Sequence, residues 1–165
     1  DELIGVKQTD GQKQIVIGTR NGYAIIFDEE EVRSTGRIAR GVKGIKLRDG
    51  DEVVGMDTIK RDSEILTVTA GGYGKRTKVE EYTTHHRGAM GVINLRVTEK
   101  TGEVIGLKVV RDGQELMLIS TNGIIIRTGL DKISVIGRAS QGVIIMKTAE
   151  DDKVASMAIL TQRAE

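Results

Sequence analysis

The chain has 165 residues, 38% hydrophobic and 30% charged, which is enough for one ordinary domain with a buried core and excludes an intrinsically disordered tail. There is no cysteine, which excludes disulfides and thiolate metal sites, and with one Phe and no Trp the core must be aliphatic. The net charge of +1 excludes a uniformly basic protein, but six basic residues and no acidic one lie between Val32 and Arg48, so charge is segregated along the chain.

In chain order the first predicted element is a β-hairpin. Residues 14–19 and 23–27 are rich in Ile and Val and flank Arg20-Asn21-Gly22, and Asn-Gly is a strong hairpin signal. A single helical turn is expected over residues 28–32. Hairpins of the same kind are predicted at 64–69 with 75–79 and at 115–120 with 124–128. In each, a glycine supplies the positive φ of the turn: Gly22, Gly72 and Gly123.

These hairpins belong to a sequence repeat with steps of 50 and 51 residues. The string Asp51-Glu52-Val53-Val54-Gly55 matches residues 1–5 and 102–106, and a degraded copy begins at Asp152. The pattern Arg-x-x-x-Gly-Val recurs from Arg37, Arg87 and Arg138, and a further strand is predicted after each copy. Four strands in about 50 residues are typical of one blade of a propeller-like array.

We therefore predict an all-β, propeller-like fold in a single partial domain spanning residues 1–165. It would contain three four-stranded blades at residues 1–50, 51–101 and 102–151, followed by a closing strand at 152–165. Closed propellers have at least four blades, so three blades form part of a larger ring or have open ends that a partner covers.

Three strings carry a family resemblance: residues 36–45 (GRIARGVKGI), 72–77 (GYGKRT) and 136–144 (IGRASQGVI). They resemble successive blades of the C-terminal domain of bacterial DNA gyrase A, and the resemblance runs through essentially the whole chain. It implies the last three blades of a six-bladed β-pinwheel that binds and bends duplex DNA around a basic perimeter. It also implies, as partners, gyrase B and the rest of gyrase A, in an enzyme that introduces negative supercoils using ATP.

One departure from the family leaves an alternative open. The gyrase box of the family, Gln-Arg-Arg-Gly-Gly-Lys-Gly, has no intact copy here, and the nearest match is residues 38–44 (IARGVKG). The related topoisomerase IV protein carries a similar domain without the intact box. A rival of another class is a protein-interaction scaffold, which the low net charge favours. Exposed blade ends also allow a homodimer.

The repeat predicts which cations contact DNA. Lys46, Arg96 and Lys147 occupy equivalent positions beside apolar residues, so on a strand they would point outward, where phosphates can be bound. The alternative is a solvated strand face. Arg37, Arg87 and Arg138 also recur, but an acid lies seven residues before each (Glu30, Glu80, Asp131), so a structural pair within each blade is equally favoured. Seven further candidates are Arg40, Lys43, Arg48, Lys75, Arg76, Lys78 and Arg127.

No catalytic set is identified, and neither a cofactor nor a metal is implied. Residues 71–77 fail as a phosphate-binding loop, because Thr69 stands where the first Gly is needed and Arg76 follows the Lys. His85 and His86 are adjacent and favour a loop over a metal site. Scarce aromatics argue against single-stranded DNA. With no signal peptide or apolar span, we expect a bacterial cytoplasmic, nucleoid-associated location without membrane contact.

Overall fold

The computed structural model describes residues 2–38 and 40–161. It is all-β, with antiparallel strands grouped in three sheets and three single 3₁₀ turns. The first sheet holds β1 (Gln14–Thr19), β2 (Tyr23–Asp28), β3 (Val53–Thr58) and β6 (Val92–Ile93). The second sheet holds β4 (Glu64–Thr69), β5 (Tyr73–Lys78), β7 (Val104–Val110) and β10 (Val143–Ile144). The third sheet holds β8 (Gln114–Ser120), β9 (Ile125–Gly129) and β11 (Val154–Thr161).

The predicted hairpins are confirmed as β1–β2, β4–β5 and β8–β9. Their turns place Gly22, Gly72 and Gly123 at φ of +92°, +85° and +84°, a conformation that glycine adopts without steric cost. The helical turn expected after the first hairpin is η1 (Glu29–Glu31), and it recurs as η2 (Val79–Glu81) and η3 (Leu130–Lys132).

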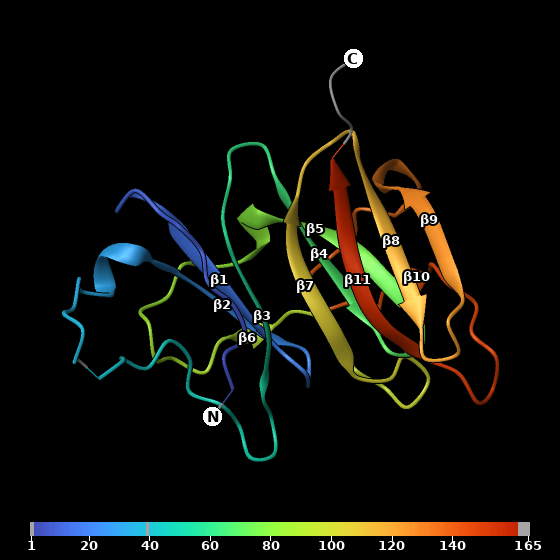
Figure 1. Ribbon diagram of the computed structural model, residues 1–165, viewed down its shortest axis with the longest axis horizontal. Coiled ribbons are helices and arrows are strands. Elements are labelled where there is room, and N and C mark those ends of the chain that lie inside the picture. The colour runs from blue at the N-terminus through green and yellow to red at the C-terminus, as the bar shows by residue number, and fades with distance from the viewer. Residues whose placement is uncertain (1, 39, 162–165) are drawn as a thin grey trace.

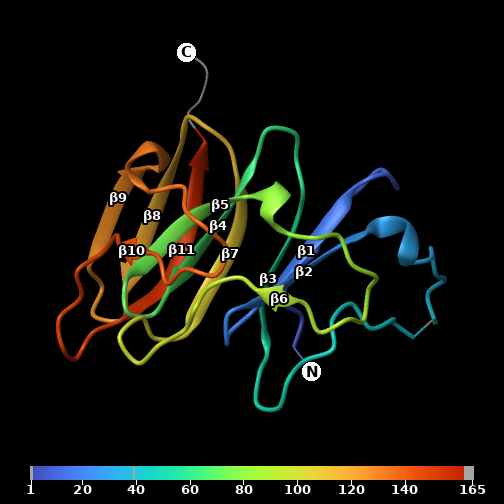
Figure 2. The ribbon, with the colours of Figure 1, turned by 180° about the vertical axis from the view of Figure 1, so that it is seen from behind.

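The sheets exchange strands between repeats. The first sheet has the order β3-β1-β2-β6, so the hairpin of the first repeat is flanked by two strands of the second. The second sheet, β10-β5-β4-β7, is built in the same way from the second and third repeats. Figure 1 shows the first and third sheets at opposite sides of the molecule, and Figure 2 shows β6 beside β2 and β10 beside β5.

This exchange changes the expected composition of a blade. A repeat of about 50 residues contributes four strands, as predicted, but two of them complete the sheet of the preceding repeat. Within the described residues the third sheet consequently has three strands, not four, because no described segment pairs with the outer edge of β9. In the first repeat, residues 2–10 and 42–43 form no strand. The expected closing strand is β11 as far as Thr161, and residues 162–165 lie outside the described part.

Both faces of the first two hairpins are buried, which explains the run of aliphatic residues in the first. Val16 and Ile26 pack toward the second sheet with Leu107, whereas Ile17 and Phe27 point the other way. Alternate residues of a strand point to opposite faces, so one continuous apolar run supplies two layers of core. A further cluster around Leu66, Leu116 and Leu130 joins the second and third sheets.

Strands β3, β7 and β11 are the inner strands. They occupy equivalent sheet edges, and β7 packs against both of the others. The short strands β6 and β10 lie at the opposite edges of their sheets and therefore face the perimeter. In the described part of the chain, no helix is long and apolar enough to cross a membrane.

Candidate nucleic-acid interface

The perimeter is formed by the segments that follow the outer strands. In each repeat a buried apolar residue precedes an exposed cation: Ile45 before Lys46, Leu95 before Arg96, and Met146 before Lys147. The predicted alternation is therefore present, although Arg96 and Lys147 follow the two-residue strands β6 and β10 instead of lying in them. Lys46 lies in the equivalent segment of the first repeat, where residues 42–43 form no strand. Among the described residues no carboxylate lies within ion-pairing distance of Lys46, Arg96 or Lys147.

Backbone hydrogen bonds fix these perimeter segments. The N–H groups of Asn94 and Leu95 donate to the carbonyl oxygen of Gly22, at 2.7 and 3.1 Å, in the hairpin turn of the preceding repeat. Ile145 and Met146 donate to Gly72 in the same way. A Cβ atom on Gly72 would lie 1.9 Å from the oxygen of Met146. The turn glycine thus has a second role. Because it has no Cβ atom, it leaves room for the backbone segment that carries the perimeter cation of the next repeat.

The perimeter loops also touch one another. The N–H of Lys46 donates to the carbonyl oxygen of Ala89 at 2.9 Å, and the N–H of Arg96 donates to that of Ser140 at 3.1 Å. Each of these two exposed cations is therefore anchored through its backbone to the loop of the following repeat. The contact recurs at a step of 50 residues, so Lys46 and Arg96 are presented in equivalent backbone geometry.

Arg87 and Arg138 connect adjacent repeats. The Nε of Arg87 donates to the carbonyl oxygen of Glu31 at 2.8 Å, and its Nη1 donates to that of Lys43 at 3.3 Å. Arg138 contacts Glu81 and Ile93 in the same way. Both arginines therefore make structural contacts between repeats. The pair expected within each blade, with Glu80 or Asp131, is not found among the described residues.

The residues that the sequence reasoning missed are thus Glu31 and Glu81. Their carboxylates accept the backbone N–H groups of Arg87 and Arg138, at 3.2 and 3.1 Å. The two glutamates recur at a step of 50, and this recurrence was the signal available in the sequence. The equivalent residue of the third repeat is Lys132. The contact between a carboxylate and the arginine N–H of the next repeat is therefore made by the first two repeats and not by the third.

Lys75 departs from the predicted role in DNA contact because it is fully buried. Its Nζ donates to the carbonyl oxygens of Gly137, Arg138 and Ser140 at 2.5–3.0 Å. Burial, partly offset by Glu81, lowers the pKa of Lys75 from 10.5 to about 8. The lysine holds together the second and third repeats.

Arg76 is also buried and departs from the prediction for the same reason. Its guanidinium donates to Glu64 and to the carbonyl oxygen of Ile133, both at 2.9 Å. The equivalent Arg127 pairs with Glu115 but is exposed, since no following repeat covers it in this chain. We leave Lys75 and Arg76 out of the proposed DNA surface.

The other predicted cations differ in how far their side chains are exposed and in whether other residues hold them. Arg48 is half-buried, donates to the carbonyl oxygen of Met90 at 2.9 Å, and stacks over the ring of Tyr23 at 3.6 Å. Apart from Arg127, which is exposed but paired with Glu115, the remaining predicted positions with exposed side chains are Arg37, Arg40, Lys43 and Lys78. His86 pairs with Glu31, and no cluster of potential metal ligands occurs among the described residues.

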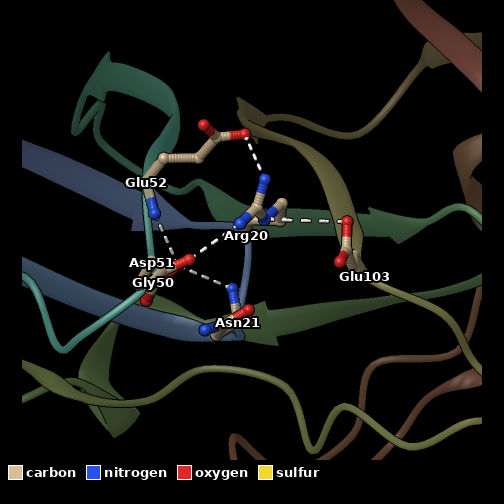
Figure 3. Close-up of polar contacts among 6 residues, drawn as sticks. All are labelled: Arg20, Asn21, Gly50, Asp51, Glu52 and Glu103. Atoms are coloured by element: carbon tan, nitrogen blue, oxygen red, sulfur yellow. Dashed lines mark hydrogen bonds and ion pairs between the residues drawn. The ribbon is translucent and has the colours of Figure 1, made fainter.

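Arg20, a cation that the sequence reasoning did not single out, joins three successive repeats (Figure 3). Its guanidinium donates to Glu52 at 2.8 Å and to the carbonyl oxygen of Gly50 at 2.7 Å, and it lies 3.6 Å from Glu103. Glu52 and Glu103 are equivalent residues of the second and third repeats. This contact helps to set how neighbouring blades are oriented, and with them the perimeter.

The fold and perimeter define a β-propeller module whose blades exchange strands. Each repeat presents an exposed cation at the same position of its perimeter segment. The family model described as the DNA gyrase C-terminal domain, β-propeller, matches residues 13–60, 63–111 and 114–161. The chain belongs to this family. Each matched unit starts at a hairpin and ends after the next inner strand.

Individual relatives agree with this assignment. The DNA gyrase A protein of Salmonella typhimurium is 45% identical over 95% of the chain, and that of Staphylococcus aureus is 44% identical over the whole chain. The chain spans less than a fifth of the length of these relatives. Among solved structures, the C-terminal domain of DNA topoisomerase IV matches with a TM-score of 0.87 at 31% identity, covering 93% of this chain and 48% of that one. The DNA gyrase A C-terminal domain matches with a TM-score of 0.83 at 29% identity, covering 90% and 51%.

Proposed function

We propose that this chain binds duplex DNA through its perimeter and helps to wrap it for a gyrase-type topoisomerase. The observation that carries the proposal is the exposed placement of Lys46, Arg96 and Lys147 at equivalent perimeter positions of successive repeats. Arg37, Arg40, Lys43 and Lys78 extend the same proposed surface, and Arg48, Arg87 and Arg138 border it.

The physical mechanism is electrostatic. Lysine and arginine side chains that neutralise phosphates release condensed counterions, which supplies affinity without reading the base sequence. The blades are arranged about the inner strands, so equivalent outward positions follow a curved path. A duplex that contacts all three cations must bend along this path, and the contacts offset the bending energy.

The parent protein is proposed to be the A protein of a DNA gyrase, a type II topoisomerase. The support is the 43–45% identity to gyrase A proteins across nearly the whole chain. The topoisomerase IV protein stays the alternative, because the gyrase box is not intact and the topoisomerase IV domain has a closely similar fold. This chain would contribute DNA binding, with catalysis in other parts of the enzyme.

The remaining partners follow from the same proposal. Within a gyrase, this module would act with gyrase B and with the rest of gyrase A, in the bacterial cytoplasm at the nucleoid. Ile124 and Ile125 are exposed beside the open edge of β9, and a homodimer through such open ends belongs to the proposal as well.

The test is binding of a duplex of about 40 base pairs across a salt series, for the wild type and a Lys46→Ala/Arg96→Ala/Lys147→Ala variant. Each phosphate contact contributes about 0.9 to the slope of log affinity against log salt, so the triple variant should lose about three. The matched control is Lys60→Ala/Lys132→Ala/Lys153→Ala, which removes the same charge from exposed lysines that do not follow outer strands.

Equal losses of slope in the two triple variants would contradict the perimeter surface, because only net charge would then matter. Absence of binding by the wild type at low salt would contradict DNA binding by these blades and would favour the protein-interaction scaffold. A circular-dichroism melt of each variant checks that the fold is retained.

A further inference from the structure

A cavity of about 530 Å³ lies where the first 3₁₀ turn meets the end of β3. Glu29 and Asp57 supply carboxylates to its wall, and Ile15, Val32 and Met56 supply aliphatic surface. A volume of this size is within the range of small-molecule sites. Most of the remaining lining is polar or charged, and it includes Lys7 and Arg33.

Glu29 is an anomaly in the repeat. It is the first residue of η1, and the first residues of η2 and η3 are Val79 and Leu130. Val79 packs against the core cluster of Ile65 and Tyr82, and Leu130 is buried in the next cluster. The first repeat therefore has a carboxylate at a position that the other repeats use for their core.

The Glu29 carboxylate lacks a compensating partner. The residue is only 7% exposed, and no hydrogen bond from a described residue reaches its buried Oε2. A carboxylate buried without a partner is unfavourable in its charged form, because the protein does not replace the hydrogen bonds that water would supply. Lys7 and Arg33 line the same cavity, but no ion pair joins either of them to Glu29 among the described residues, so the carboxylate can still accept a cation.

The cavity already accepts one ammonium group. The Nζ of Lys7 lies 3.3 Å from Oδ1 of Asp57, whose side chain is almost fully buried. Asp57 is further fixed because its Oδ2 accepts the N–H of Val109 at 2.9 Å. The described residues contain no group of three potential metal ligands, which favours an organic cation over a metal ion.

We propose that this cavity binds a free aliphatic amine, with its ammonium group at Glu29 and its methylenes against Ile15, Val32 and Met56. The ammonium would supply the charge-assisted hydrogen bonds that the carboxylate lacks. The site is separate from the perimeter cations, so it does not depend on the proposed DNA binding.

The experiment is calorimetric titration of putrescine into the 165-residue chain at pH 7, at an ionic strength kept constant with NaCl. We expect saturable binding with one amine per chain. Glu29→Gln keeps the shape of the side chain and removes its charge, and it should weaken binding by about tenfold or more. The matched control, Glu150→Gln, neutralises an exposed carboxylate outside the cavity and should leave affinity unchanged within about twofold.

Two further variants sharpen the result. Glu29→Leu introduces the residue type of the third repeat, and we expect a higher Tm together with loss of binding, as when a functional charge is replaced by a core residue. Lys7→Ala removes the competing ammonium and should tighten binding. No saturable binding by the wild type, or equal affinity of wild type and Glu29→Gln, would overturn the proposal. Tighter binding of Nα-acetyl-lysine methylamide, which imitates a lysine side chain of a protein, than of putrescine would overturn the assignment to a small-molecule amine.

Discussion

The Nζ of Lys75 lies 2.9 Å from the carbonyl oxygen of Gly137, in the loop of the following repeat. The same loop carries Arg138 and contacts the backbone of Arg96. One buried ammonium group thus holds a loop that supports a perimeter cation. The equivalent positions of the first and third repeats are Ile25 and Ile126, so this contact is specific to the junction between the second and third repeats.

Lys75 should give the stability of the protein a distinctive pH dependence. Its pKa is about 8 in the folded chain, against an ordinary value of 10.5, so between these pH values the unfolded chain binds more protons. The free energy of unfolding should therefore rise with pH between about 8 and 10.5, by up to about 3 kcal/mol. Urea unfolding across this range measures it, and Lys75→Met should remove the rise. An identical pH profile in this variant would show that Lys75 titrates normally.

Gly72 and Gly123 form a matched pair that isolates the contact between repeats. Both have φ near +85°, but a Cβ on Gly72 would meet the backbone oxygen of Met146, whereas around Gly123 it would meet open space. Gly123→Ala should cost about 1 kcal/mol of unfolding free energy from backbone strain alone. Gly72→Ala should cost about 3 kcal/mol or more, because the next repeat cannot dock. Equal losses in urea unfolding would rule out this docking role.

Arg76 and Arg127 test how far the following repeat determines the role of a side chain. Arg76→Ala removes a buried guanidinium and leaves the half-buried Glu64 carboxylate without its charged partner, so it should destabilise the chain by about 2–3 kcal/mol. Arg127→Ala removes a guanidinium that is itself largely exposed and should cost less than about 1 kcal/mol. The measurement is chemical unfolding of both variants. A loss below about 1 kcal/mol for Arg76→Ala would contradict its role as a buried connector.

Asp152 should make the third hairpin sensitive to acid. Hydrogen bonds from the side chains of Ser120 and Thr121 and from two backbone N–H groups lower the pKa of its carboxyl group from 3.8 to about 2. The unfolded chain then binds more protons between about pH 4 and pH 2, so stability should fall as the pH is lowered through this range. Asp152→Asn should show a weaker loss in acid unfolding, and Asp151→Asn, at an exposed neighbour, should behave like the wild type.

Local sequence determined the hairpins, their turns and the alternation at the perimeter. The β1–β2 hairpin follows from apolar runs around Asn21-Gly22, and Gly22 has the predicted positive φ. Ile45 is buried and Lys46 exposed because adjacent residues of an extended segment face opposite ways. The repeat made these inferences strong, since each pattern occurs three times.

Tertiary structure alone decided which repeat supplies each partner. A two-residue strand such as β6 has no sequence signal for its pairing with β2, and Arg87 lies next to Glu31 only because adjacent repeats interlock. Lys75 and Arg76 read as surface cations, yet they are buried because residues 133–140 of the next repeat fold over β5. Turn chemistry and side-chain alternation depend on near neighbours in the chain, whereas burial and pairing depend on segments about 50 residues away.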